Sequence, residues 1–498
     1  MNANYPVLIV LAPLLASFIV AALIWVDRRL CYPVTLLGLA GSVFCSWQLL
    51  IQVLKSGTIA YHLGGWPPPM GIELRIDLLN ILILVLVALV ALVNMVASKK
   101  SIHEELPIKE GAFCAVYLLF VTGLFGVLVT ADLFNLYVLL EITSLASYAL
   151  LAMGNPDRAP WASLNYVFLG VIGASFYLLG VGYLYIMTGS LNMLDVASIL
   201  PQVGDSSAIA VGFVFCLVGV WIKMGLFPLH MWLPNAYSYA PISASRVIAP
   251  LMTKVMVYVM IRLMFSVFGF EYILEDLHIQ DWVVGLASAA IIAGALMALA
   301  QKDFKKMLAY IIVCEIGYMV GGAWLGNEQG MIGAILHIVN DGLMTFALFL
   351  VLGNIVYAHK KTQIADLDGI FASMPWTMAG FVLAGVSIIG VPPTCGFFSK
   401  WYLLLGGMQA GYSLFVVALI VSSLISAVLV FRVIETGFIP SAENGHDHHS
   451  GHETALQEAP VSMLASLGLV GASLIAVGIW SGEIVQRVIV PFVQQGMN

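Results

Sequence analysis

Residues 219–228 read Gly-Val-Trp-Ile-Lys-Met-Gly-Leu-Phe-Pro, an apolar run that holds a single lysine and ends in a proline. An ionisable group at membrane depth costs at least about 2.5–3.5 kcal/mol on insertion scales, so Lys223 requires a function or a partner. Pro228 and Pro234 lack the backbone N–H that continues a helix. The stretch therefore predicts a membrane helix that is broken beside a buried charge.

The composition of the whole chain is that of a multi-span membrane protein. Of 498 residues, 61% are apolar and 9% are charged, whereas a soluble protein carries about 25% charged residues. Disordered chains are excluded because they are rich in charge and poor in apolar residues. The chain has 20 basic and 27 acidic residues, and without a basic excess nucleic-acid binding is not expected.

Apolar runs of about 20 residues, the length that crosses the hydrocarbon core as a helix, recur along the chain. We expect an all-α polytopic fold with about fourteen transmembrane helices in the lipid bilayer. The expected spans are 5–26, 32–53, 78–97, 112–130, 132–153, 162–187, 207–228, 243–268, 281–300, 305–325, 329–357, 376–405, 411–435 and 461–482.

Lysine and arginine are distributed unequally between the loops, which predicts the orientation. The loops after odd-numbered spans hold twelve, and the other loops with the tail hold four. We therefore expect a protein of the cell inner (plasma) membrane with the odd-numbered loops in the cytoplasm and both termini on the non-cytoplasmic side. The twelve are Arg28, Arg29, Lys99, Lys100, Lys109, Arg158, Lys302, Lys305, Lys306, Lys360, Lys361 and Arg432, and the four are Lys55, Arg75, Arg262 and Arg487.

Six ionisable groups lie inside five of the expected spans. Burial lowers the pKa of a lysine and raises the pKa of a carboxylate, and pairing the two groups reverses both shifts. A pair whose contact can be weakened and restored therefore changes its proton affinity. We interpret the set as a proton relay, with two structural alternatives: a pair that only fixes helix packing, and a lysine that extends to the membrane surface. The six are Glu141, Lys223, Lys254, His337, Asp341 and Lys400.

Two broken spans indicate an internal repeat. Pro392 and Pro393 interrupt the twelfth span as Pro228 interrupts the seventh, and interrupted helices at matching places are typical of inverted-repeat transporters. Spans four to eight then repeat as nine to thirteen, and Glu141-Ile142 matches Glu315-Ile316. The expected organisation is an N-terminal three-helix segment (1–111), a first repeat (112–268), a second repeat (281–435), a His-rich cytoplasmic loop (436–460), and a last helix with its tail (461–498).

Signals for metals and cofactors are weak. Four histidines lie within residues 446–452, which fits either transition-metal affinity or a solvated loop, and we favour the loop. Six scattered cysteines form no CxxC pair, so they predict packing residues and no metal centre. Neither a GxGxxG nor a GxxxxGK[ST] motif occurs. We therefore expect no cofactor in this chain and no redox or nucleotide site of its own.

Several motifs carry a resemblance to a known family. Residues 131–141 read ADLFNLYVLLE, residues 223–234 read KMGLFPLHMWLP, and residues 390–400 read GVPPTCGFFSK. In this order they resemble the antiporter-like subunits shared by respiratory complex I, membrane-bound hydrogenases and the Mrp multisubunit cation/proton antiporters. The first motif is most similar to that of the Mrp D-type subunit.

The resemblance implies fourteen spans with two inverted five-helix repeats, and it implies roles for individual residues. Glu141 would pair with Lys223, and Lys254, His337 and Lys400 would continue the relay along the membrane midplane through a hydrated axis. Other membrane subunits would be the partners, with protons and monovalent cations as the transported species.

One position departs from the family pattern. Similar proteins often have a lysine eight residues after the eleventh-span histidine, and this chain has Thr345 there. Either Glu315 and Asp341 compensate, with protons held on these carboxylates and on His337, or the chain is a divergent member whose second half-channel is water-filled or silent.

Three functions are compatible with these observations. The first is a proton-translocating subunit of a multisubunit Na⁺/H⁺ antiporter. The alternative is the proton-pumping membrane subunit of a complex-I-like NADH:quinone oxidoreductase or a hydrogenase-type redox complex. A third is a self-sufficient transporter for an organic solute, which the order of the motifs disfavours.

Overall fold

The computed structural model describes residues 4–154, 157–203, 206–438 and 456–497. Within these residues, thirteen helices are long and apolar enough to cross a membrane. The predicted span 376–405 is a pair of shorter helices, α15 (Pro375–Ile389) and α16 (Cys395–Gln409), so the break expected there is present. The histidines of residues 446–452 lie outside the described residues.

The long helices follow the predicted spans closely, because each apolar run forms one helix. They are α1 (Tyr5–Val26), α2 (Cys31–Ser56), α3 (Leu78–Glu105), α4 (Glu110–Val129), α5 (Leu133–Ala152), α6 (Ala159–Thr188), α8 (Ser207–Met224), α10 (Ile242–Leu263), α11 (Gln280–Leu299), α12 (Phe304–Ala323), α13 (Glu328–His359), α17 (Ser413–Phe438) and α18 (Val461–Ile479).

Shorter elements lie at the ends of these helices. Strands β1 (Ile59–His62) and β2 (Glu73–Ile76) form an antiparallel hairpin with Ile59 opposite Ile76. The short helices are α7 (Met193–Val203), α9 (Leu233–Tyr239), α14 (Ile370–Ser373), α19 (Ser481–Ile484) and α20 (Val490–Met497), and tighter or wider turns occupy Arg28–Leu30, Leu63–Gly65, Met264–Phe268, Tyr272–Asp276, Ile364–Leu367 and Val485–Ile489.

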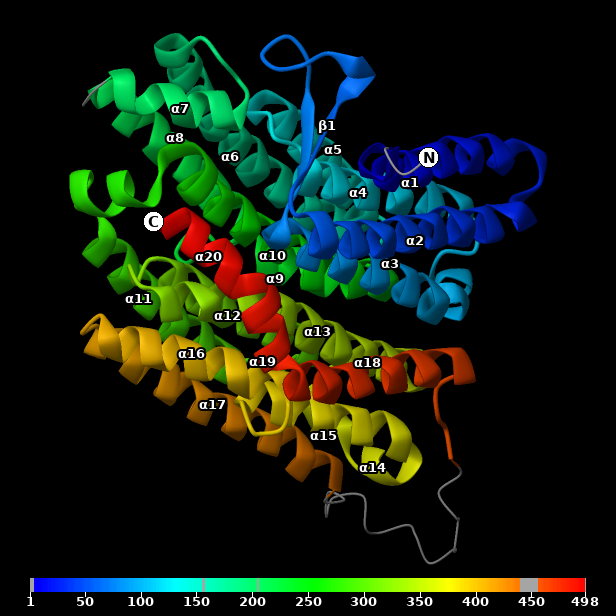
Figure 1. The fold of residues 1–498 in the computed structure, drawn as a ribbon. Helices are drawn as coiled ribbons and strands as arrows, with labels where there is room; N and C mark the ends of the chain where they lie inside the picture. Colours follow the sequence, from blue (N-terminus) through cyan, green and yellow to red (C-terminus); the bar gives the residue numbers. More distant parts are fainter. Residues whose placement is uncertain (1–3, 155–156, 204–205, 439–455, 498) are drawn as a thin grey trace, which may run out of the picture.

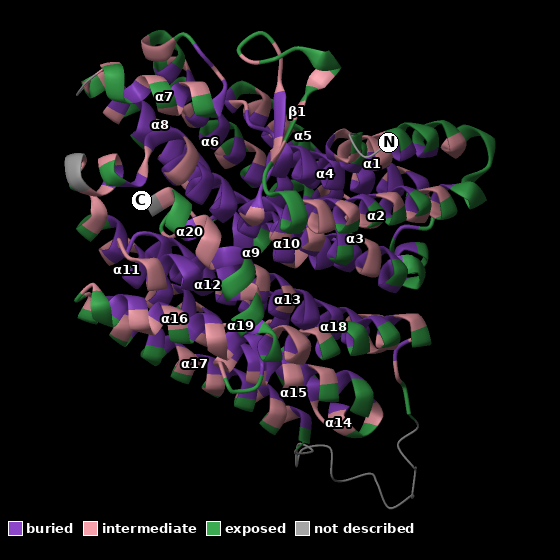
Figure 2. Ribbon diagram, in the orientation of Figure 1, coloured by how far each residue is buried: buried purple, intermediate pink, exposed green. Residues whose placement is uncertain are grey.

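The helices lie side by side, with α1 and α2 at one edge of the molecule and α16 and α17 at the other (Figure 1). Helices α10, α12 and α13 form the centre, and 89% of the most apolar stretch of each is buried. The outer helices α1, α2 and α17 carry many exposed residues (Figure 2), including large apolar side chains such as Phe18 and Phe431. This distribution fits a protein whose outer surface faces lipid, because exposed apolar area is stable there.

The segments that connect successive helices, here called junctions, line two pockets at opposite ends of the helices. The Lys305 pocket, about 760 Å³, is lined by the junctions that follow α3, α5, α9, α11 and α13. The Arg262 pocket, about 340 Å³, is lined by the hairpin, the α4–α5 junction, α7, the end of α10 and α20. Because α10 begins at the first pocket and ends at the second, the two pockets open at opposite ends of the helices.

Backbone hydrogen bonds between helix ends reveal the internal repeat. Before α5, the Leu133 N–H donates to Leu191 O and Ala131 O accepts from Met193, both at 2.8 Å. Before α12 the same two bonds recur 171 residues later: the Phe304 N–H donates to Thr362 O at 2.8 Å, and Lys302 O accepts from Ile364 at 2.9 Å. One set borders the Arg262 pocket and the other the Lys305 pocket, so the two units are inverted.

This register corrects the match between Glu141 and Glu315. Asp132 caps α5 and Asp303 caps α12, each accepting a hydrogen bond from the backbone N–H three residues later. Counting from these caps, Glu315 corresponds to Ser144, one helical turn beyond Glu141. The two-residue sequence match was therefore wrong by three residues, because two adjacent identities cannot define a helix register.

Both interrupted helices end at a glycine in the left-handed region. Gly225 (φ 75°) ends α8 and Gly390 (φ 92°) ends α15, a conformation that glycine adopts without steric cost. Carbonyl groups freed at a break require donors at this depth. The Trp232 indole donates to Ile222 O at 3.0 Å in the first break, and Lys400 Nζ donates to Ile388 O at 2.6 Å in the second.

A buried ion pair joins the start of α3 to the end of α10 at the Arg262 pocket. Asp77 caps α3 and accepts two hydrogen bonds from the Arg262 guanidinium, at 2.6 and 2.9 Å. Burial alone raises the pKa of Asp77, but the charge and hydrogen bonds of Arg262, with the N–H groups of Leu79 and Asn80, hold that pKa below its ordinary value. The pair fixes the first long helix after the hairpin against the centre.

We expect Asp77→Asn to lower the free energy of unfolding by about 3–5 kcal/mol, because it leaves Arg262 buried without a counter-charge. Since the pKa of Asp77 is lower in the folded protein, the pair stabilises at neutral pH, and this contribution disappears as the pH falls below about 4. Unfolding in mixed detergent at a series of pH values measures both effects.

The matched control is Asp27→Asn, which removes an exposed carboxylate that caps a short turn. It is expected to cost about 1 kcal/mol or less. Equal stability of Asp77→Asn and the wild type at neutral pH would show that the pair does not hold α3 and α10 together.

Candidate functional site

The first of three buried clusters joins α5 to α8. Lys223 Nζ lies 2.8 Å from Glu141 Oε1 and donates a second hydrogen bond to Ser144 Oγ at 2.7 Å. The Lys223 side chain is 2% exposed, whereas that of Glu141 is 23% exposed. The pairing expected from the resemblance is therefore present, and its carboxylate is the partner with access to the surface.

The second cluster lies at the centre, between α10 and α13. Lys254 Nζ lies 2.8 Å from Asp341 Oδ2, and both side chains are fully buried. Thr345 donates a hydrogen bond to Asp341 Oδ1 at 2.8 Å. Thr345, at the position where the resemblance led us to expect a lysine, thus supplies a neutral donor to the carboxylate that binds Lys254.

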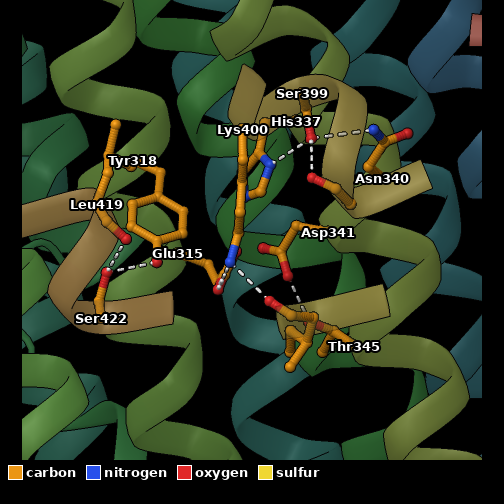
Figure 3. Close-up of polar contacts among 12 residues, drawn as sticks. Glu315, Tyr318, His337, Asn340, Asp341, Thr345, Ser399, Lys400, Leu419 and Ser422 are labelled. Carbon is orange, nitrogen blue, oxygen red and sulfur yellow. Dashed lines mark hydrogen bonds and ion pairs between the residues drawn. The ribbon is translucent and has the colours of Figure 1, made fainter. Parts of the chain in front are cut away.

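The third cluster joins α12, α13 and α16 (Figure 3). Glu315 Oε2 lies 2.6 Å from His337 Nε2, and Glu315 Oε1 lies 3.9 Å from Lys400 Nζ. Glu315 and His337 are fully buried. One carboxylate therefore lies between an imidazole and an ammonium group.

The surroundings of His337 fit both of its protonation states. A neutral ring that donates from Nε2 to Glu315 accepts at Nδ1 from Ser399 Oγ, at 2.8 Å. A protonated ring donates from both nitrogens, and the Ser399 hydroxyl then donates to Gly396 O at 3.3 Å. Asn340 donates to Ser399 Oγ at 3.1 Å in either state. Both ring nitrogens of His337 therefore have a hydrogen-bond partner in either protonation state.

Lys400 also holds the second helix break together. Besides Ile388 O, its ammonium group contacts Ser423 Oγ at 3.4 Å and lies 4.9 Å from the centre of the Tyr318 ring. Tyr318 is fixed in turn by a hydrogen bond with Ser422 at 2.6 Å (Figure 3). A purely structural role for Lys400 therefore has a physical basis, alongside the long ion pair to Glu315.

Helix α13 connects the second and third clusters. His337 and Asp341 are four residues apart, so they lie on the same side of α13 with an axial separation of about 6 Å. Asn340 lies between them and donates to Cys395 O at 2.7 Å. The arrangement offers consecutive proton-binding groups along one helix in the protein interior.

All seven predicted site residues belong to these clusters. The sequence did not identify the neutral partners Ser144, Ser399 and Tyr318, because serine and tyrosine in apolar runs resemble ordinary packing residues. It also did not identify His230, which is 2% exposed at the break after α8 and has no hydrogen-bond partner among the described residues. Its position two residues after Pro228 was the available signal.

The six cysteines are buried and form no disulfides, and no three histidine, cysteine or acidic side chains gather within metal-binding reach in the described part of the chain.

Comparisons with known proteins agree with this architecture. Residues 130–426 match the family model described as "NADH:quinone oxidoreductase/Mrp antiporter, TM". A protein of Desulforudis audaxviator, named as the N-type subunit of an NADH-quinone oxidoreductase, is 41% identical over 98% of each chain. A protein of Alkalihalophilus pseudofirmus, named as the D-type subunit of a Na(+)/H(+) antiporter, is 31% identical over 84% of each chain.

Solved structures show the same fold. A chain of the membrane-bound sulfane sulfur reductase, an archaeal respiratory membrane complex, superposes with a TM-score of 0.89 at 26% identity, covering 99% of both chains. A chain of the Mrp complex from Dietzia sp. superposes with a TM-score of 0.88 at 20% identity, covering 100% of this chain and 98% of that one. The chain belongs to the family of NADH:quinone oxidoreductase and Mrp antiporter membrane subunits.

Proposed function

We propose that this chain translocates protons as one membrane subunit of a multisubunit complex. The observation that carries the proposal is the set of three charged clusters, namely the pairs Glu141–Lys223 and Lys254–Asp341 and the group of Glu315, His337 and Lys400. Buried pairs contribute little to stability compared with well-packed apolar residues, so their recurrence on several membrane helices favours a functional role.

Breaking an ion pair in one cluster favours proton transfer. When a buried lysine separates from its carboxylate, two unpaired charges remain in a medium of low dielectric constant, at a cost of several kcal/mol. Moving a proton from the ammonium group to a carboxylate, or onward to the next group, removes that cost. A change at one pair therefore alters proton occupancy at the next, and Glu141, Lys254 and His337 act as successive carriers.

Two drivers remain as candidates for this translocation. Sodium exchange, the first expectation, is supported by the relative named as a sodium/proton antiporter component. A redox reaction in partner subunits is supported by the relative with the higher identity and the fuller coverage, which is named as part of an NADH-quinone oxidoreductase. We favour the redox-driven complex on this ground.

We also propose an orientation of the chain in the membrane. The excess of lysine and arginine in the odd-numbered loops supports an orientation with the Lys305 pocket on the cytoplasmic side and the Arg262 pocket, with both termini, on the opposite side.

Glu141→Gln tests the relay in vesicles that contain the assembled complex. We expect the proton flux to fall by about 10²-fold, because a residue that transfers protons contributes on that scale. Proton flux is recorded once with a quinone and an electron donor and once with a sodium gradient. The condition under which the wild-type complex moves protons also identifies the reaction that drives transport.

The control for this variant is Glu104→Gln. It removes the carboxylate of an exposed Lys360–Glu104 pair at 2.9 Å, whose geometry matches that of Lys223–Glu141. Full flux in Glu141→Gln, or an equal loss in Glu104→Gln, would contradict the proposed relay.

Thr345→Val tests the hydroxyl that holds Asp341. Removing a donor to a buried charged group costs about 1.5–3 kcal/mol, so we expect the proton flux to fall about tenfold. Thr345→Ser keeps the donor and should retain the wild-type flux. If valine and serine behave alike, Thr345 is a packing residue and the middle of the relay does not depend on it.

A further inference from the structure

Arg246 is a buried cation that none of the three clusters uses. It lies in the first turns of α10, is fully buried, and donates from Nε to Phe349 O at 3.3 Å. Its two terminal nitrogens have no hydrogen-bond acceptor among the described residues. A guanidinium group stays protonated inside proteins, so this is a permanent positive charge without a carboxylate in contact.

A glycine on α13 leaves the space that the Arg246 side chain occupies. Gly353 of α13 faces the guanidinium so closely that a Cβ atom at this position would overlap Nη2, Cζ and Nε. Arg246 also precedes Lys254 by eight residues on the i, i+4 ridge of α10, an axial separation of about 12 Å. The fixed charge therefore lies two helical turns from the central pair.

Arg246 lies between the central pair and the Lys305 pocket. Ile242, one turn before Arg246 on α10, lines that pocket together with Glu105 and Lys305. Both of these charged side chains act electrostatically on Arg246. Arg246 and the charged side chains that line the pocket make four cations and three carboxylates, so the entrance to this part of the interior carries a small positive excess. The cations are Arg158, Arg246, Lys305 and Lys306, and the carboxylates are Glu105, Asp157 and Asp303.

Unpartnered polar atoms lie on α10 and on the two long helices packed against it. Four buried hydroxyl or amide oxygens without a hydrogen-bond partner among the described residues lie on α3, α10 and α13, on both sides of Arg246. Buried groups of this kind in native proteins are satisfied by ordered water. We therefore expect a hydrated column from the Lys305 pocket to the Lys254–Asp341 pair. The four atoms are Ser101 Oγ, Ser243 Oγ, Thr253 Oγ1 and Asn354 Oδ1.

An open column of this kind would let protons bypass the relay, because Lys254 would exchange protons with one side of the membrane at all times. A fixed guanidinium group in a narrow hydrated passage excludes protons and cations electrostatically. We propose that Arg246 is such a barrier: it closes the column between the Lys305 pocket and Lys254 to protons and monovalent cations, so that Lys254 exchanges protons only with the neighbouring clusters. This inference rests on the proposed function.

The test is passive proton leak through the purified complex in vesicles, driven by a potassium diffusion potential without electron donor or sodium gradient. Arg246→Gln removes the charge, and we expect the leak to rise about tenfold, the effect of one unit charge at about 12 Å and an effective dielectric constant of about 20. Arg246→Lys keeps the charge and should leak no more than the wild type.

Arg158→Gln is the matched control, since it removes an exposed arginine at the rim of the same pocket and should leave the leak unchanged. An unchanged leak in assembled Arg246→Gln overturns the inference, and so does a leak in Arg246→Lys as large as that in Arg246→Gln, which would indicate a packing effect.

If Arg246→Gln does not assemble, Arg246→His replaces it at pH 8, where imidazole is neutral. The expected result is the same rise in leak, and a wild-type leak in assembled Arg246→His overturns the inference. Since the assay needs no turnover, its outcome is independent of the Glu141→Gln experiment that tests the proposed function.

Discussion

The contact between Lys254 and Asp341 determines how the rest of the structure is arranged. Both side chains are fully buried, and their 2.8 Å separation joins α10 to α13 at the centre of the molecule. Losing either partner would leave the other charge buried and unpaired at a cost of about 3–5 kcal/mol, which favours packing of the two helices with these residues in register. The other two clusters lie on either side of this contact and follow the same rule, with Glu141 neutralising Lys223 and Glu315 facing both His337 and Lys400.

The inverted repeat places similar backbone geometry around different side chains. Each unit has an Asp-capped helix bound to the segment that follows the next helix, and each has a helix that ends at a left-handed glycine. The chemistry differs within this common backbone: a tryptophan satisfies the first break and Lys400 the second. In the register set by the caps, Ser144 in the first unit corresponds to Glu315 in the second. One architecture therefore holds two chemically unequal halves of the proposed pathway.

Much of this could be predicted from the sequence, because membrane helices follow apolar runs and buried charges stand out within them. The break at Pro392 and the depth of Lys223 were visible in this way, and the Glu141–Lys223 pair followed from the family resemblance. Partners from distant segments could not be predicted. The assignment of Asp341 to Lys254 depends on how α10 and α13 pack, and only the packing of α13 against Arg246 shows that this charge is buried.

The central claim is that carboxylates inside the helix bundle change protonation during transport. Difference infrared spectroscopy of the complex in membranes, recorded while a proton gradient is imposed, measures this directly through the C=O stretch of protonated carboxylic acids. The account predicts a band in the wild type that Asp341→Asn removes while Asp77→Asn, at the edge of the bundle, retains it. A spectrum without any carboxylic acid band, or one that Asp341→Asn leaves unchanged, would contradict the account.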